Sequence, residues 1–144
     1  MRKGWVLGIG LLGAGSWLAM PAALAGETTV TATMSGSEEV PTPGDPDGKG
    51  TATVVLDDAK NTACYEVTYE NIGQPTAAHI HAGAKGVAGP PVIDLKIKTN
   101  GNKGCVPADP TTLKAVRDNP GGHYFNIHTG DYGNGAIRGQ LAKA

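Results

Sequence analysis

Two histidines separated by a single residue are the feature of this sequence with the clearest chemical potential. His79 and His81 lie in a short run of small and apolar residues that ends at Gly83. In a β-strand, residues two apart point to the same side, with their Cα atoms about 7 Å apart. Two imidazoles at this spacing can bind one metal ion, so the segment predicts one side of a metal site.

A second strand-like segment, residues 123–129, contains another candidate histidine. Phe125 and Ile127 are its large apolar residues and are expected to face the core. By alternation, Tyr124, Asn126 and His128 then lie on the opposite, polar side. This segment therefore offers a third imidazole on a polar sheet face.

The last strand-like segment continues this face, because Ile137 and Leu141 are expected to point inward. Neutral imidazole nitrogen is a ligand suited to both copper and zinc, so we predict that the three histidines bind one such ion. A second interpretation is open, in which they only hydrogen-bond to amides or backbone carbonyls and hold adjacent strands together. If the three strands are neighbours, the shared polar face carries His79, His81, Asn126, His128, Arg138 and Gln140.

Two residues close to this face are assigned structural roles. His123 shares the side of Phe125 and follows two glycines, so it is expected at a strand end rather than among the ligands. Arg138 has five donors that can reach acceptors on neighbouring strands. We expect Arg138 to form a structural polar network with Asn126 and Gln140.

Other motifs give little support for catalysis or for further ligands. The glycine-rich run 83–90 lacks the Gly-Lys-Ser/Thr ending of a phosphate-binding loop. Asp45, Asp47 and Gly48 resemble the start of a calcium loop, but the later ligands, including the bidentate glutamate, are missing. No serine lies in a nucleophile-elbow motif. The sequence favours a binding role over enzymatic activity.

The elements that must position these residues have the pattern of an all-β protein. Glycine and proline punctuate the sequence, and runs rich in valine, threonine, isoleucine and tyrosine lie between them. This pattern predicts a Greek-key-like antiparallel β-sandwich of about seven or eight strands. The predicted strands are residues 28–34, 51–56, 63–69, 76–81, 92–98, 123–128 and 136–141.

One short helix is predicted among these strands. Asp109 can cap its start, and Pro110 suits its first turn. Leu113 and Val116 follow at a spacing of three residues, and the Asn-Pro pair at 119–120 ends the pattern.

The first 25 residues have the features of a secretory signal peptide. Arg2 and Lys3 precede an apolar stretch, and Ala23 and Ala25 form a small-residue cleavage signal. Cleavage after Ala25 is expected to leave one domain, residues 26–144, in a secreted or periplasmic protein. Beyond this segment no apolar run approaches the roughly 18 residues of a membrane helix, so no membrane association is expected after cleavage.

The charge balance argues against a nucleic-acid partner. The chain has 12 basic and 13 acidic residues, and loss of Arg2 and Lys3 changes the formal charge from −1 to −3. Lysine and arginine form no cluster in the remainder, whereas binding to phosphates needs a basic patch.

The two cysteines, Cys64 and Cys105, are too far apart for a C-x-x-C redox or zinc motif. In a chain exported to an oxidising compartment they are expected to form a disulfide. This bond would tether the predicted strand 63–69 to the loop after Lys98.

Several segments, in this order along the chain, resemble the CHRD domain, the module repeated in chordin and found singly in secreted bacterial proteins. They are SGSEEVP at 35–41, GTA at 50–52, AHIHAG at 78–83, GPPV at 89–92, YFNIHT at 124–129 and IRGQL at 137–141. The resemblance implies a compact β-sandwich similar in topology to copper-zinc superoxide dismutase. The family commonly has Gly-Glu before the Ile-Arg-Gly-Gln run, whereas this chain has Gly135-Ala136. An acidic partner for Arg138 would then have to be Glu38, Glu39 or Asp131.

Three functions are compatible with these observations. The first is a binding module that holds one copper or zinc ion through the histidines. The second is a superoxide-dismutase-like or other copper redox enzyme, although the bridging histidine and separate zinc ligands of the dismutases have no evident counterparts. The third is a protein-binding module with a structural histidine cluster, by analogy with growth-factor binding by chordin, whose partner the sequence does not identify.

Overall fold

The computed structural model describes residues 26–144 as an all-β fold, and the predicted signal peptide, residues 1–25, lies outside the described residues. The elements are β1 (Glu27–Ser35), η1 (Gly36–Glu38), β2 (Lys49–Asp57), β3 (Thr62–Glu70), β4 (Pro75–Ala82), β5 (Pro91–Asp94), α1 (Ile97–Asn100), β6 (Lys103–Pro107), α2 (Pro110–Asp118), η2 (Pro120–Gly122), β7 (His123–Thr129), β8 (Ile137–Gln140) and β9 (Ala142–Lys143).

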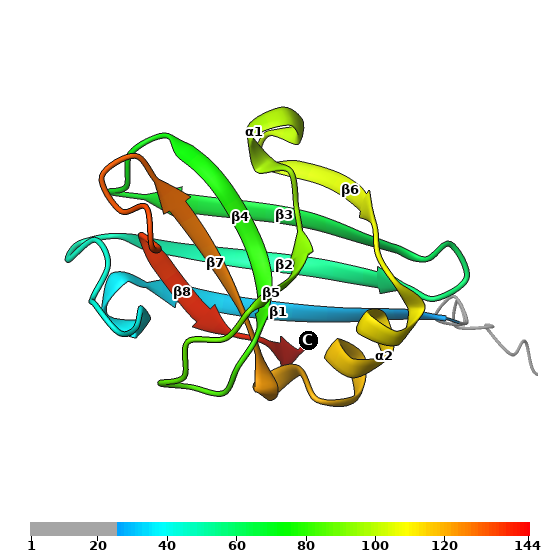
Figure 1. Ribbon diagram of the computed structural model, residues 1–144. Coiled ribbons are helices and arrows are strands. Elements are labelled where there is room, and N and C mark those ends of the chain that lie inside the picture. The colour runs from blue at the N-terminus through cyan, green and yellow to red at the C-terminus, as the bar shows by residue number, and fades with distance from the viewer. Residues whose placement is uncertain (1–25) are drawn as a thin grey trace, which may run out of the picture.

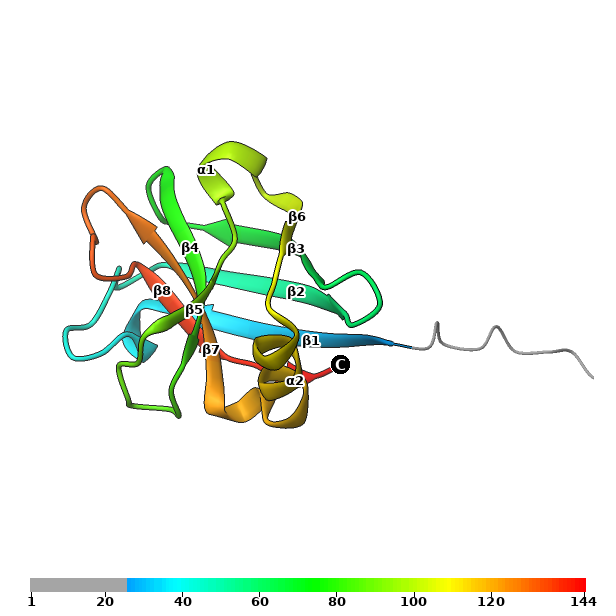
Figure 2. The same ribbon diagram turned by 45° about the vertical axis from the view of Figure 1, so that its right-hand side comes forward.

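The strands form one antiparallel sheet that folds over on itself into two layers. Its order is β5-β4-β7-β8-β1-β2-β3-β6, and β9 pairs with β1. Figures 1 and 2 show β1, β2, β3 and β6 as one layer, crossed steeply by β4, β5, β7 and β8. A short junction, with the pair Ser35 and Arg138 opposite each other, links β1 to β8. The predicted all-β sandwich is confirmed.

Alternation along the strands places the apolar core between the two layers. In β3, Tyr65 and Val67 are buried while Glu66 and Thr68 are exposed. Phe125 and Ile127 of β7 face the same interior and are fully buried. The remaining core residues include Val30, Met34, Val54, Leu56, Ile80 and Ile137.

The predicted helix is present as α2, and it closes one end of the core. The carboxylate of Asp109 accepts a hydrogen bond from the backbone N–H of Thr111 at 2.9 Å, as an N-cap residue does. Leu113 and Val116 are buried on the inner side of the helix.

The prediction of one strand over residues 92–98 is wrong in its second half. The strand β5 ends at Asp94, whose carboxylate accepts a hydrogen bond from the backbone N–H of Lys96 at 3.0 Å. Lys96 has a positive φ of 56°, and α1 begins at Ile97. An aspartate that bonds the backbone two residues later forms a turn, so the chain leaves the sheet where apolar alternation alone predicted that it continues.

The strand β6 was not predicted, because Gly104 and Pro107 give it low β-propensity. It pairs with β3 and places Cys105 directly opposite Cys64. The structure contains the expected disulfide between these two residues. The bond therefore links two paired strands rather than a strand and a loop, and a disulfide fits an oxidising compartment.

No helix among residues 26–144 is long and apolar enough to span a bilayer.

Candidate metal centre

The register of three neighbouring strands places the predicted polar residues on one sheet face. Between β4 and β7, His79 lies opposite Asn126 and His81 lies opposite Tyr124, while His128 lies opposite Ala77, two pairs beyond His79. Between β7 and β8, Asn126 lies opposite Arg138. This face is turned away from the apolar core, as the alternation predicted.

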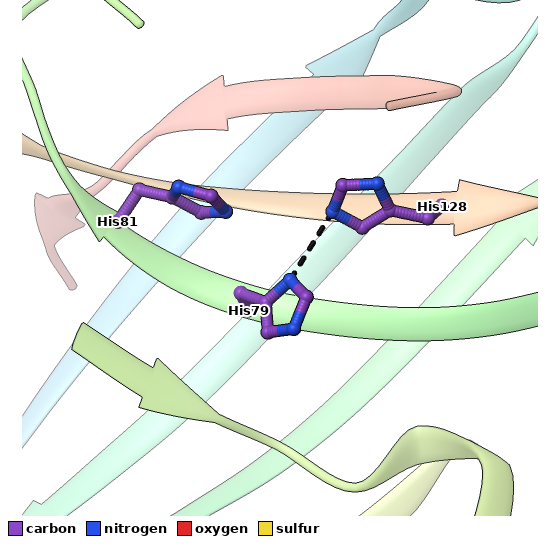
Figure 3. Close-up of side chains that lie close together, drawn as sticks. All are labelled: His79, His81 and His128. Carbon is purple, nitrogen blue, oxygen red and sulfur yellow. Dashed lines mark hydrogen bonds between the residues drawn. The ribbon is translucent and has the colours of Figure 1, made fainter. Parts of the chain in front are cut away.

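Three imidazoles from two strands converge on this face. His79 and His81 come from β4, His128 comes from β7, and Figure 3 shows their rings pointing toward one another. One ring nitrogen from each residue lies within 4.8 Å of the others, and Nδ1 of His79 is 3.1 Å from Nε2 of His128. Tetrahedral ligation at the usual zinc–nitrogen distance of about 2.0–2.1 Å needs the rings to close slightly. The histidine triad, defined as these three residues, could hold one metal ion.

Backbone carbonyls fix the tautomers of two triad members. Nδ1 of His81 lies 2.8 Å from the carbonyl oxygen of Gly89, and Nδ1 of His128 lies 2.9 Å from that of Gly133. Because a carbonyl oxygen only accepts, each Nδ1 must carry the hydrogen and donate it. In the neutral rings, both Nε2 atoms are then left with a free lone pair toward the triad. Metal-bound histidines are oriented by this kind of second hydrogen bond.

The third imidazole, His79, can change tautomer to complete the set. Without an ion, its Nδ1–H can donate to the lone pair of His128 Nε2 across the 3.1 Å contact. Transfer of that hydrogen to its own Nε2 would free Nδ1 as a ligand without any change in the charge of the ring.

A glycine-rich segment, the 83–90 loop, brings the carbonyl that orients His81. Gly89 donates its N–H to the hydroxyl oxygen of Tyr124 at 3.1 Å, and that hydroxyl lies 3.2 Å from the Gly89 carbonyl oxygen. A Cβ added to Gly89 would lie 1.5 Å from the carbonyl oxygen of Ala82. Only glycine permits this approach, so the loop and the orientation of His81 depend on it.

Stacking on the ring of Tyr124 holds the ring of His81 in place. Its ring lies parallel to that of Tyr124, with 4.7 Å between the centroids. The guanidinium carbon of Arg138 lies 3.4 Å from the centroid of the Tyr124 ring. The resulting column of guanidinium, phenol and imidazole restricts the rotation of one triad member.

Arg138 and Gln140 connect β8 to the surrounding loops. Nη2 of Arg138 donates to the carbonyl oxygen of Ala84 at 2.9 Å and to Oε1 of Gln140 at 3.1 Å. The amide of Gln140 donates to the carbonyl oxygens of Gly83, Gly121 and His123. The polar side of these strands is therefore covered by loops, and Arg138 is only 1% exposed.

Replacing Arg138 with lysine is expected to lower the free energy of unfolding by roughly 1 to 3 kcal/mol, the usual cost of leaving buried polar partners unsatisfied. Lysine cannot keep both the two hydrogen bonds and the flat contact with Tyr124. Chemical unfolding monitored by circular dichroism would measure the change. An unchanged unfolding midpoint would show that the side chain does not stabilise the fold.

A buried acidic group accompanies Arg138. Glu39 follows η1, is 4% exposed, and its carboxyl fills the space beside Gly135, where an added Cβ would lie 2.3 Å from Oε1. Burial raises the pKa of the Glu39 carboxyl to about 7, while the charge of Arg138 and the amide of Asn126 lower it. Of the acidic partners expected for Arg138, Glu39 is the buried one, and the charge of Arg138 lowers its pKa.

The environment of the triad lowers the pKa of two of its imidazoles. Desolvation is the largest cause that lowers the pKa of His79 and of His81 below 6.5, and the proximity of His128 lowers both further. Because only a neutral imidazole can coordinate a metal, the lowered pKa values keep His79 and His81 available as ligands at mildly acidic pH.

Sequence reasoning found the three triad histidines and the separate position of His123, whose Nδ1 pairs with the carbonyl oxygen of Asn119 at 2.8 Å. It missed the supporting groups: the Gly89 and Gly133 carbonyls, the stacking by Tyr124, and the burial of Glu39. Apolar alternation predicts a strand, but it does not show which loop carbonyl will lie against that strand. The isolated Glu-Glu pair before Val40 was the only sequence sign of a buried acid.

Comparison with known families gave one match that covers most of the chain. Residues 30–141 match the family model of the CHRD domain. The matched region includes all three triad histidines and Asn126, Arg138 and Gln140. Searches among curated proteins and among solved structures gave no match.

Proposed function

The chain belongs to the CHRD domain family, and we propose that it is a binding module that holds one copper or zinc ion through His79, His81 and His128. Cleavage of residues 1–25 and export to the periplasm or the extracellular space are part of the proposal. The Cys64–Cys105 disulfide supports such an oxidising location.

The observation that carries the proposal is the hydrogen bonding of the two ring nitrogens of His81. Its Nε2 atom is buried and has no hydrogen-bond partner, while its Nδ1 is held by the Gly89 carbonyl. A histidine that served only to tie strands together would be expected to have its buried nitrogens paired. The lone pair of His81 Nε2 is instead directed toward the other two imidazoles. This arrangement favours a cation as the partner that Nε2 lacks.

The donor set indicates which ions suit the triad. Imidazole nitrogen binds zinc and copper, and the affinity of nitrogen sites for divalent ions rises to a maximum at Cu(II). The triad contains no thiolate or thioether, the soft ligands that favour Cu(I). We therefore expect Cu(II) to bind more tightly than Zn(II).

Metal titration of the purified protein tests the proposal. After treatment with a chelator, calorimetry with Zn(II) and with Cu(II) should each show one equivalent bound per chain. Since the pKa values of His79 and His81 are lowered, Zn(II) affinity should stay nearly constant between pH 8 and about 6.5 and fall only below that range.

Three outcomes separate the candidate functions. One bound ion without redox turnover supports the binding module. Bound copper together with superoxide dismutation or other turnover would replace it with the redox enzyme. If neither ion binds at micromolar concentration, the histidines are a structural cluster and a protein-binding role becomes the better explanation.

A further inference from the structure

Asn126 is a buried polar residue on the same face as the triad, and its side-chain oxygen lacks a partner. It is 2% exposed, and its Oδ1 atom has no hydrogen bond. On β7 it lies directly opposite His79 and two residues from His128, so its side chain is a neighbour of both on the same sheet face. Leaving a buried amide oxygen unpaired costs free energy, so its retention here needs an explanation.

The surroundings of the amide indicate which way it points. The Asn126 amide lies near enough to two ionisable groups to affect them, since it lowers the pKa of the Glu39 carboxyl and raises the pKa of the His81 ring. An ionised carboxylate only accepts hydrogen bonds, so the NH₂ group is the part of the amide that suits Glu39. The carbonyl oxygen is then left for the side of His81.

Two buried acceptors on this face have no hydrogen-bond partner, and the unpaired donor nearest to Asn126 in the register, Nη1 of Arg138, comes from β8, on the other side of β7 from His81. One acceptor is Oδ1 of Asn126, and the other is Nε2 of His81, whose hydrogen is fixed on the opposite nitrogen by Gly89. Two lone pairs repel each other unless a positively charged or hydrogen-donating group lies between them. A metal ion held by the triad would satisfy both acceptors at once.

We propose that the side-chain oxygen of Asn126 takes the fourth coordination position of the ion held by the histidine triad. The inference rests on the proposed metal site and adds a ligand that is neither histidine nor acidic. Three nitrogens and one oxygen make a closed four-coordinate set, which is typical of structural and storage sites rather than of sites that keep a position open for a substrate. This ligand set also selects divalent ions over Cu(I), because an amide oxygen is a hard donor.

Nuclear magnetic resonance of the full protein tests the contact without any substitution. On addition of one equivalent of Zn(II), the side-chain amide resonances of Asn126 should shift together with the ring resonances of the triad. The side-chain amide of Asn102, which lies in the turn before β6, is the internal reference and should not move.

Substitutions then separate ligation from packing. Asn126→Ala should weaken Zn(II) binding by at least roughly tenfold, the lower bound for residues that support a metal site. Asn126→Asp has nearly the same shape and keeps an oxygen ligand, so it should bind Zn(II) at least as tightly as the wild type. Asn102→Asp adds the same charge at an exposed position and should leave the affinity unchanged.

The outcomes distinguish this inference from the function on which it rests. If the wild type takes up no Zn(II), the metal site itself fails. If the wild type binds Zn(II) but the Asn126 amide resonances stay in place, or Asn126→Asp is weakened as much as Asn126→Ala, then Asn126 is not a ligand while the triad remains one. Circular dichroism of both variants would confirm that a loss of affinity does not reflect unfolding.

Discussion

Replacing His128 with alanine is expected to abolish stoichiometric binding of Zn(II) and Cu(II), lowering the affinity by more than roughly 100-fold, beyond the usual range for supporting residues. His128 is the one triad member on β7, and its Nε2 is 3.1 Å from Nδ1 of His79. Its removal leaves two imidazole ligands, both from β4, and even with the proposed Asn126 oxygen the four-coordinate set is incomplete. His79→Ala should have an effect of the same size, and calorimetry would measure both.

His123→Ala is the matched control, because this histidine also lies on β7 but pairs with the Asn119 carbonyl. It should keep the metal affinity of the wild type even if the fold is slightly less stable. Equal losses of affinity in His123→Ala and His128→Ala would contradict the site, because they would indicate a general effect of removing an imidazole from β7. Unchanged binding in His128→Ala would contradict it directly.

Side-chain alternation made the triad predictable from the sequence. The i, i+2 spacing of His79 and His81 forces them to one side of a strand, and the apolar pair Phe125 and Ile127 places His128 on the polar side of another. The sequence could not prove that the two strands are neighbours. Their pairing, with His79 opposite Asn126, supplies that step.

The groups that support the triad depend on long-range contacts that local patterns do not encode. Gly89 reaches His81 because the 83–90 loop folds back on β4, and only the space at Ala82 shows why glycine is needed there. Lys96 illustrates the same limit in the fold, since its turn with Asp94 ends a strand that apolar alternation predicted to continue. Glu39 lies far from Arg138 in the sequence, and only the packing of the loop after η1 against β8 makes it a buried acid.

Replacing Glu39 with glutamine is expected to raise the free energy of unfolding, by an amount that depends on pH. This is the second large effect that we expect. Burial raises the pKa of the Glu39 carboxyl from 4.5 to about 7. Between these values the folded protein holds a proton that the unfolded chain releases, so this group's contribution to stability falls as pH rises. The difference between the two pKa values corresponds to about 3 kcal/mol. Glutamine does not ionise and avoids this cost.

The measurement is the free energy of unfolding of both proteins, without metal, at a series of pH values. The variant should match the wild type near pH 4.5 and exceed it by up to about 3 kcal/mol well above pH 7. The comparison must use the difference between the two curves, because the lowered pKa values of His79 and His81 make stability rise with pH up to about 6.5 in both proteins.

Glu66→Gln is the control for the loss of an acidic side chain, because Glu66 is 62% exposed and faces Lys103 across a 3.6 Å ion pair. Exposed ion pairs contribute little to stability, so this variant should follow the wild-type curve. A constant difference between Glu39→Gln and the wild type over the whole pH range would show that Glu39 ionises as easily in the folded chain as in the unfolded one. In that case Arg138 would compensate the carboxylate fully, and the buried pair would act as a fixed ion pair rather than as a proton-binding group.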